Sequence, residues 1–342
     1  MKILGIESSC DDTSIAIVDS NKNIIANEVL SQDNIHRDFQ GIVPELAARN
    51  HVLFIDKILS KILSKTEMNI NQIDLISATA GPGLIGGLLV GLSFAKTLAQ
   101  VNNKPFVAVN HLEGHALTAR LSDNVNYPFL LLLISGGHTN FYFIKNINDY
   151  YNLGGTLDDA LGEAFDKVAN ILKLGFPGGP KIEKLSQKGN KDLVILPKPL
   201  INKRNLDLSF SGLKTAVLNS YASSVTKNKY KTEDIAASFQ YTVSDILCKK
   251  LSLAIELTEK KFFNFKNIVI AGGVASNNFL RQKLKEEAEK NNKSIYLPPT
   301  NLCTDNGAMI AWAGYELYTK GIKSNLNFEA RPRWPLEEKR IN

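Results

Sequence analysis

Short apolar runs separated by polar turns predict two β-hairpins that lie far apart in the sequence. The first has strands over Lys2–Ile6 and Ser14–Val18, joined by a polar turn. The second has strands over Phe129–Ile134 and Asn140–Ile144, joined by the glycine-rich turn SGGHT. Two similar hairpins in corresponding places predict an internally duplicated fold.

Strands and helices alternate through the rest of the chain, which favours a layered α/β architecture. Further strands are predicted over Ile73–Thr79, Pro105–Val109 and Lys266–Ala271, and helices over Leu84–Ala99, His111–Arg120, Gly162–Leu172, Phe279–Lys290 and Asn306–Tyr318. Ser, Asp and Asn cluster at Leu121–Tyr127, where a boundary between the repeats is expected. We therefore expect two lobes, over residues 1–125 and 126–330, and leave open a return of the chain to the first lobe near its end. The Pro-rich, charged segment 331–342 is expected to be a basic surface arm.

Composition supports a globular protein of ordinary size. The chain has 342 residues, of which 44% are hydrophobic and 22% charged, enough to bury a full core and too apolar for disorder. Apolar runs fall far short of the roughly 20 residues of a membrane helix, and the start MKILGIESS lacks the pattern of a signal peptide. Three widely separated cysteines without CxxC spacing favour a reducing compartment. We expect a cytoplasmic protein that binds no membrane.

The net charge of +6 is concentrated in one segment. Residues 181–231 hold eleven Lys and Arg against three Asp and Glu, a local charge of +8 that leaves about −2 for the remainder. Such a segment favours contact with phosphates, although lysine-rich surfaces often only keep a protein in solution.

Three of the five histidines lie between His111 and His138. His111 and His115 are four residues apart on a predicted helix, so they share one face at the spacing that chelates a metal ion. The alternative is two polar residues on a helix surface. A two-histidine site needs another ligand, and Asp305 is a candidate whose alternative role is to cap the last predicted helix.

The acidic residue between the two histidines argues against a peptidase. In a zinc protease the general-base Glu directly follows the first His. Glu113 instead lies two residues from each histidine, which rotates it about 200° away, to the opposite face of the helix.

Four glycine-rich turns, AGPGLIGG, LISGGHT, FPGGP and AGGVASNN, could let backbone N–H groups approach phosphate oxygens. Each alone is equally a tight turn, and no Walker or GxGxxG motif occurs. Together they suggest a nucleotide held between two lobes. The other polar candidates, which would ordinarily be solvated, are Glu7, Asp11, Asp12, Glu163 and Asp166.

Taken together, the motifs are far more specific than any one of them. They are GIESSCDDTSIAI, VPELAARNH, TAGPGLIGGLLVG, NHLEGH, LLLISGGHTN, DDALGEAFDKVA, FPGGP, LSFSGLKTA, IAGGVASNN, CTDNGAMIAWAG and RPRWP. Over residues 1–336 the chain resembles the bacterial form of the tRNA N6-adenosine threonylcarbamoyltransferase family, once labelled O-sialoglycoprotein endopeptidases. The resemblance implies a duplicated actin-like fold, shared with sugar kinases and Hsp70-type ATPases, with the active site in the cleft between two lobes.

The resemblance also implies a reaction. A threonylcarbamoyl group would pass from threonylcarbamoyl-adenylate to N6 of the adenine 3′ to the anticodon, in tRNAs that read codons beginning with A, and AMP would leave. An iron (Fe²⁺) or zinc ion would be held by His111, His115 and Asp305, and Asp11 would be a base or orienter. By similarity, the donor would contact Leu133, Ile134, Ser135, Gly136, Gly137, His138, Asp166, Gly179, Glu183 and Asn277, and many relatives carry Asp at the position of Glu183.

Partners follow from the same resemblance: tRNA, a catalytically inactive actin-like paralogue that pairs through the first lobe, and a small P-loop ATPase. A separate synthase would supply the adenylate. The basic segment 181–231, with Arg331, Arg333 and Arg340, becomes the expected tRNA-facing surface. Two other classes of protein compete with this hypothesis: a stand-alone actin-like ATPase or small-molecule kinase, and, less favoured, a metallopeptidase.

Overall fold

The computed structural model describes residues 1–36, 39, 41–262 and 264–340, and it divides the chain into two compact units. The first unit consists of Met1–Val125, Asn146–Tyr150 and Pro298–Asn342, and the second of Asn126–Lys145 and Tyr151–Leu297. The second lobe was expected to end at residue 330, with a return to the first lobe left open, and the chain does return to the first unit from Pro298 onward. The reason is that helix α10 (Gly307–Thr319) packs on strands of the first unit.

The first unit contains a five-stranded sheet in the order β3-β2-β1-β4-β5. Its strands are β1 (Lys2–Glu7), β2 (Thr13–Asp19), β3 (Ile24–Leu30), β4 (Leu75–Gly81) and β5 (Phe106–Asn110). β1 is antiparallel to β2 and parallel to β4, and β5 continues the parallel half. The predicted first hairpin is confirmed, and β3 extends it by one strand that the sequence analysis did not predict.

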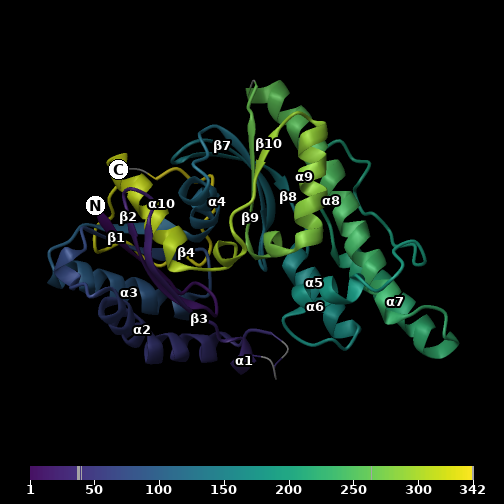
Figure 1. Ribbon diagram of the computed structural model, residues 1–342, viewed down its shortest axis with the longest axis horizontal. Coiled ribbons are helices and arrows are strands. Elements are labelled where there is room, and N and C mark those ends of the chain that lie inside the picture. The colour runs from purple at the N-terminus through teal and green to yellow at the C-terminus, as the bar shows by residue number, and fades with distance from the viewer. Residues whose placement is uncertain (37–38, 40, 263, 341–342) are drawn as a thin grey trace. The chain divides into compact units, whose positions relative to one another are not determined.

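Helices cover both faces of this sheet, with α2 (Pro44–Thr66) and α3 (Ile85–Val101) on one face, and α10 with α4 (His111–Ser122) on the other (Figure 1). Alternating residues of β1 serve the two faces. Leu4 and Ile6 are fully buried in the apolar core shared with α2 and α3. Gly5 faces α10, where an added Cβ would collide with the carbonyl oxygen of Gly307. The short helix α1 (Asp33–His36) precedes α2.

The second unit repeats the strand order of the first. Its sheet runs β10-β9-β6-β7-β8, with β6 antiparallel to β7 and parallel to β9. Its strands are β6 (Phe129–Ile134), β7 (Thr139–Asn146), β8 (Asp149–Gly155), β9 (Asn267–Ala271) and β10 (Ser294–Tyr296). Reading β6 to β10 as β1 to β5 gives the same order, which confirms the predicted internal duplication.

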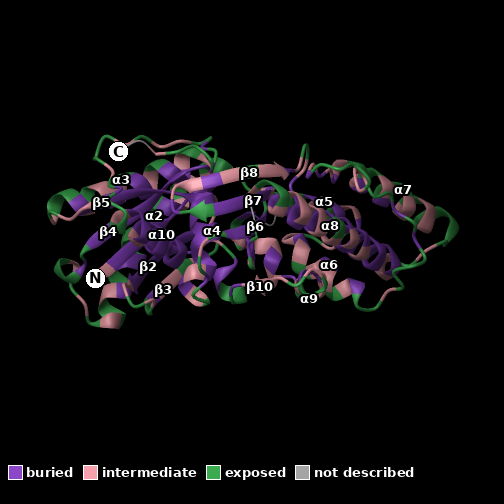
Figure 2. Ribbon diagram, turned by 90° about the horizontal axis from the view of Figure 1, so that it is seen from above, coloured by how far each residue is buried: buried purple, intermediate pink, exposed green. Residues whose placement is uncertain are grey.

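Five helices belong to the described part of the second unit. They are α5 (Leu161–Ile171), α6 (Gly178–Ser186), α7 (Ser211–Lys227), α8 (Thr232–Phe262) and α9 (Asn278–Lys290). α7 buries Leu213 and Val217 and is otherwise partly or fully exposed (Figure 2). Short 3-10 turns lie at Ile70–Gln72, Gly273–Ser276 and Thr300–Leu302. Among the described residues, none of the helices is both long and apolar enough to cross a membrane.

The C-terminal segment is not the surface arm that its composition suggested. Trp334 is 3% exposed and belongs to the core of the first unit, and Leu336 is buried as well. The guanidinium of Arg340 donates to the carboxylate of Glu113 and lies over the Trp334 ring. The indole ring is too apolar to leave in water, so it ties the segment to the core. Residues 341–342 of the expected arm lie outside the described residues.

Candidate metal centre and nucleotide pocket

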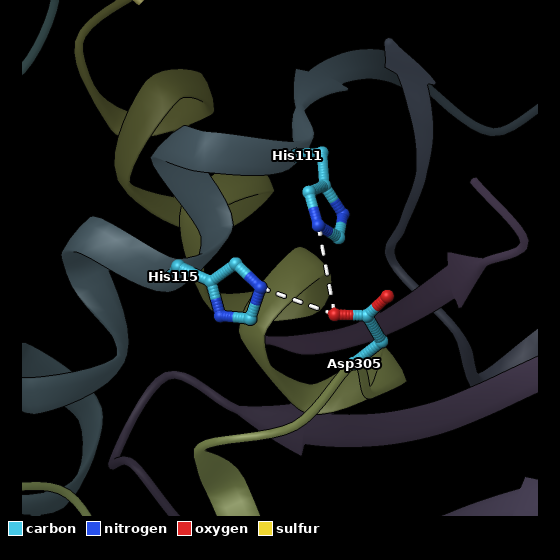
Figure 3. A group of neighbouring side chains, drawn as sticks. All are labelled: His111, His115 and Asp305. Carbon is cyan, nitrogen blue, oxygen red and sulfur yellow. Dashed lines mark hydrogen bonds and ion pairs between the residues drawn. The ribbon is translucent and has the colours of Figure 1, made fainter. Parts of the chain in front are cut away.

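Two histidines and one aspartate of the first unit face one another (Figure 3). His111 begins α4 directly after β5, and His115 follows one helical turn later on the same face. Asp305 Oδ1 lies 3.1 Å from His115 Nε2 and 3.5 Å from His111 Nε2. The structure thus brings together the three side chains proposed as metal ligands, although the two histidines and Asp305 are nearly 200 residues apart in the chain.

Asp305 is not the N-cap of α10, so one of the two roles expected for it is wrong. Asn306 is the N-cap instead, and its side-chain oxygen accepts a hydrogen bond from the backbone N–H of Met309. Both residue types are good helix caps, so the sequence could not separate their roles. Since Asn306 satisfies the helix, the carboxylate of Asp305 can turn towards the histidines.

The electrostatics of this cluster favour a positive charge. Burial of His111 opposes protonation of its imidazole, but the carboxylates of Asp305 and Glu7 outweigh burial and raise the His111 pKa to about 9. A group of imidazoles and carboxylates that holds a proton this firmly also provides a favourable environment for a metal cation.

The donor set fits a zinc or iron ion. Imidazole nitrogen and carboxylate oxygen suit both metals. Ligand atoms bound to a tetrahedral ion at about 2.0–2.2 Å lie roughly 3.4 Å from one another, and the two spacings from Asp305 are 3.1 and 3.5 Å. His115 is 1% exposed, which keeps competing water away from its ring.

Glu113 points away from these ligands, as the helical spacing predicted. It is 1% exposed, accepts a hydrogen bond from the Tyr150 hydroxyl at 2.7 Å, and pairs with Arg340. A carboxylate held in this way on the opposite face of α4 cannot serve as the base of a zinc protease at His111 and His115.

Two aspartates at the tip of the first hairpin respond to the charge of Asp305. Burial and then the charge of Asp305 raise the pKa of Asp11. The same two causes, joined by the charge of Asp11, raise the pKa of Asp12 to about 8.

By contrast, Glu163 is half exposed and pairs with Lys167 at 2.8 Å, the ordinary behaviour of a surface acid on a helix.

A separate pocket lies within the second unit, between α5, α6 and the turn that follows β9. Its cavity volume is about 160 Å³, and the pocket is partly open to solvent. Five of the ten predicted donor contacts line it: Gly136, Asp166, Gly179, Glu183 and Asn277. The other five, at the end of β6 and in the turn after it, are outside the lining: Leu133, Ile134, Ser135, Gly137 and His138. Leu133 and Ile134 are fully buried strand residues, so they offer a ligand no side chain.

At three glycines around the pocket, neither packing nor backbone conformation requires the residue to be glycine. At Gly136, Gly137 and Gly179 an added Cβ would meet no described atom within 4 Å. Their backbone angles are open to any residue, in contrast to Gly272, whose φ is +95°. Since neither packing nor backbone conformation demands glycine at these positions, the space suits close approach of a ligand.

Two carboxylates at the pocket are fixed by backbone donors. Asp166 Oδ1 accepts from Gly178 N at 2.7 Å, and Glu183 Oε1 accepts from Asn278 N at 2.8 Å. Glu183 therefore reaches the start of α9. Rigid carboxylates of this kind are common partners of ribose hydroxyls.

Comparison with known proteins adds a family to this geometry. The model of the tRNA N6-adenosine threonylcarbamoyltransferases matches residues 23–312. A protein of Rickettsia bellii (strain OSU 85-389) with that same description is 52% identical over 338 residues, which cover 98% of this chain and 99% of the relative.

Two solved structures resemble the whole chain at low identity. The activator of the 2-hydroxyisocaproyl-CoA dehydratase from Clostridium difficile, with bound ADPNP, has a TM-score of 0.52 at 16% identity and covers 95% of this chain and 99% of its own. HypF of T. kodakarensis has a TM-score of 0.61 at 14% identity, over 94% of this chain and 48% of its own. This likeness shows the fold alone, and it confirms the predicted actin-like architecture.

Proposed function

Because the chain belongs to the tRNA N6-adenosine threonylcarbamoyltransferase family, we propose that it transfers a threonylcarbamoyl group from threonylcarbamoyl-adenylate to adenine N6 in tRNA. The acceptor is the adenine 3′ to the anticodon in tRNAs that read codons beginning with A. The bond from the carbamoyl carbon to the AMP phosphate oxygen breaks, a bond to N6 forms, and AMP leaves. The observation that carries this proposal is the glycine-lined pocket with two fixed carboxylates, in a chain of this family.

The pocket of the second unit is the proposed place of the donor's adenosine. Asp166 and Glu183 supply acceptors for the ribose hydroxyls, and Asn277 supplies an amide. The open space beside Gly136, Gly137 and Gly179 admits the phosphate to backbone N–H groups. Firm binding of the AMP part holds the reactive carbonyl in place, so that binding energy lowers the entropy cost of the transfer.

The chemistry requires an activated carbonyl rather than a strong base, because an aromatic amine is a weak nucleophile and the mixed anhydride already has a good leaving group. A zinc or iron ion held by His111, His115 and Asp305 would act as a Lewis acid towards the carbonyl oxygen. Asp11 is the proposed acceptor of the N6 proton, and its raised pKa suits it to hold that proton.

The proposed tRNA surface is the basic segment 181–231. Lys184 and Lys188 are exposed on and after α6, and Lys227, Lys229 and Lys231 are exposed around the end of α7. Arg340, expected in the same surface, is committed to Glu113.

The proposed partner surface for the inactive paralogue is on α2 and α3. Val52, Leu53, Ile85 and Leu89 are each about half exposed or more, at 49–60%. Such a set of large apolar side chains on one pair of helices is typical of a protein interface.

The test is product formation. Purified protein with its partners, threonine, bicarbonate, ATP and unmodified tRNA should yield threonylcarbamoyl-adenosine by mass spectrometry, and no product from folded, metal-loaded protein would refute the proposal. Rapid ATP hydrolysis that survives His111→Ala and ignores tRNA would favour the kinase or ATPase class instead. Proteolysis abolished by Glu113→Gln would be needed to revive the peptidase.

A matched pair of glycine variants tests the donor pocket. Gly179 and Gly212 are each the second residue of a helix, α6 and α7, and each has room for a side chain. Gly179→Val should fill the pocket and raise the KM for the adenylate at least tenfold, whereas Gly212→Val should leave it unchanged. Equal effects of the two substitutions would place the donor elsewhere.

A further inference from the structure

Glu7 is a buried carboxylate that ends β1 beside the metal centre. Its side chain is fully buried, and Oε2 lies 3.1 Å from His111 Nδ1. Two more donors hold it: the backbone N–H of Ser9 at 2.6 Å and the hydroxyl of Thr79, on β4. These two donors fix the Glu7 carboxylate independently of its contact with His111.

The chemistry of this contact decides which nitrogen of His111 carries the proton. A carboxylate oxygen can only accept, so an unprotonated Nδ1 would set two lone pairs against each other at 3.1 Å. Nδ1 must therefore donate, which in the neutral ring leaves the lone pair on Nε2. The Ser9 hydroxyl, 3.0 Å from the same Nδ1, can accept from it as well. Nε2 is the atom that faces Asp305, at 3.5 Å.

We propose that Glu7 is a positioning residue of the metal centre, whose carboxylate takes the Nδ1 hydrogen bond of His111 and so presents the Nε2 lone pair to the metal. A carboxylate behind a histidine ligand fixes the ring and makes its free nitrogen a better donor. The inference rests on the proposed metal centre, and it does not depend on the acyl-transfer reaction.

The two histidine ligands differ in this respect. His115 Nε2 also faces Asp305, but the buried Nδ1 of His115 has no hydrogen-bond partner among the described residues. Of the two rings, His111 is therefore the one whose Nδ1 a described carboxylate holds, and the metal should depend on Glu7 more than on any support behind His115.

Glu7→Gln tests the proposal with almost no change in shape. Gln Oε1 can still accept from Ser9 N, while the amide NH₂ replaces Oε2 and donates towards His111 Nδ1. That contact favours the opposite tautomer, in which Nε2 carries the hydrogen and cannot bind a metal. Zinc alone, titrated against a competing chelator, should bind about 10–100-fold more weakly to the variant than to the wild type.

The matched control is Glu113→Gln, because Glu113 is an equally buried glutamate on the opposite face of the ligand-bearing helix. It should bind zinc as the wild type does. If His111→Ala retains wild-type zinc affinity, the metal centre itself is wrong. If His111→Ala loses zinc but Glu7→Gln does not, the metal centre stands and the role of Glu7 is wrong.

A second measurement needs no metal and tests the proposed tautomer of His111 even if Glu7→Gln does not fold. Nitrogen-15 NMR of metal-free protein at pH 10, above the His111 pKa of about 9, reports the tautomer, with the signals assigned by His111→Ala. The wild type should carry its ring hydrogen on Nδ1, and folded Glu7→Gln should carry it on Nε2. A wild-type hydrogen on Nε2 overturns the proposal, as does an unchanged tautomer in the variant.

Discussion

At the scale of single residues, two neighbours with side chains of almost the same shape do different work. Asn306 caps α10, and Asp305 turns to the histidines. The amide of Asn306 suffices for the cap, which needs only one oxygen acceptor, whereas the proposed metal centre needs a negatively charged ligand. The sequence offered both residues for either role, and only the backbone before α10 separates them.

Removing each function by a single substitution should separate the contribution of Asn306 to stability from that of Asp305 to metal binding. Asn306→Ala should lower the free energy of unfolding by about 1 kcal/mol, the usual cost of a lost cap, and keep zinc. Asp305→Asn should keep the cap and lose most of its zinc affinity. Urea unfolding and zinc titration of both variants check this, and wild-type zinc binding by Asp305→Asn would contradict it.

The raised pKa of His111 predicts a pH dependence with a definite sign. Zinc must displace the proton that the imidazole holds below a pKa of about 9, so zinc affinity should rise about tenfold per pH unit from pH 7 and level off near pH 9. In the metal-free protein the same proton stabilises the fold fully below the ordinary pKa of 6.5, and this contribution is lost as pH rises through about 9. Chelator competition at pH 7, 8 and 9 measures the first effect, and a flat profile would refute it.

At the scale of elements, α4 carries different chemistry on its two faces. One face presents the two histidines proposed as metal ligands, and the other holds Glu113 against Tyr150 and Arg340. The helical period predicted this separation, but the partners of Glu113 come from segments distant in the chain. Nothing in the local pattern of the C-terminal segment revealed that Arg340 folds back onto this helix.

Breaking the ion pair of α4 should therefore destabilise the protein without touching the metal. Arg340→Ala leaves the Glu113 charge buried and unpaired, which should cost about 3 kcal/mol of unfolding free energy. Adding Glu113→Gln to Arg340→Ala should recover part of that loss, because the neutral amide needs no cation. Chemical denaturation of the three proteins measures this, and an Arg340→Ala variant as stable as wild type would contradict it.

The sequence predicted the central strands of both sheets best, whereas no helix was predicted over α2 or α8. Both hairpins and the helix at His111 were found within a few residues, because their apolar runs are continuous and end at turn residues. β3 was missed because most of its residues are exposed or half-buried, so its pattern does not alternate clearly. The unit to which α10 belongs was left open, because its small residues indicate close packing without indicating a partner.

At the scale of the whole molecule, the duplicated strand order separates two tasks between two units. The first unit holds the histidines and Asp305, and the second holds the glycine-lined pocket. Only half of the predicted donor contacts line that pocket. They were predicted from sequence motifs, whereas the shape of the cavity depends on how α5, α6 and the turn after β9 pack.

The basic segment of the second unit predicts a salt-dependent affinity for tRNA. Replacing exposed Lys184 and Lys188 together with glutamate should weaken binding and lower the slope of log K against log salt by about 2. Lys320 and Lys323, exposed in the first unit, are the matched control and should leave the slope unchanged. The measurement is tRNA affinity between about 50 and 200 mM salt, a range over which phosphate contacts weaken strongly. Equal slopes for the two double variants would place the tRNA elsewhere.

The contact of Gly5 with α10 has a consequence for how the protein is made. β1 is synthesised well before the helix that covers one of its faces, because the two are separated by about 300 residues. At about 5–20 residues per second, that face of the first sheet waits roughly 15–60 seconds for its cover. Asp305 directly precedes that helix, so a nascent chain cannot complete the proposed ligand set until the segment that carries α10 is being made.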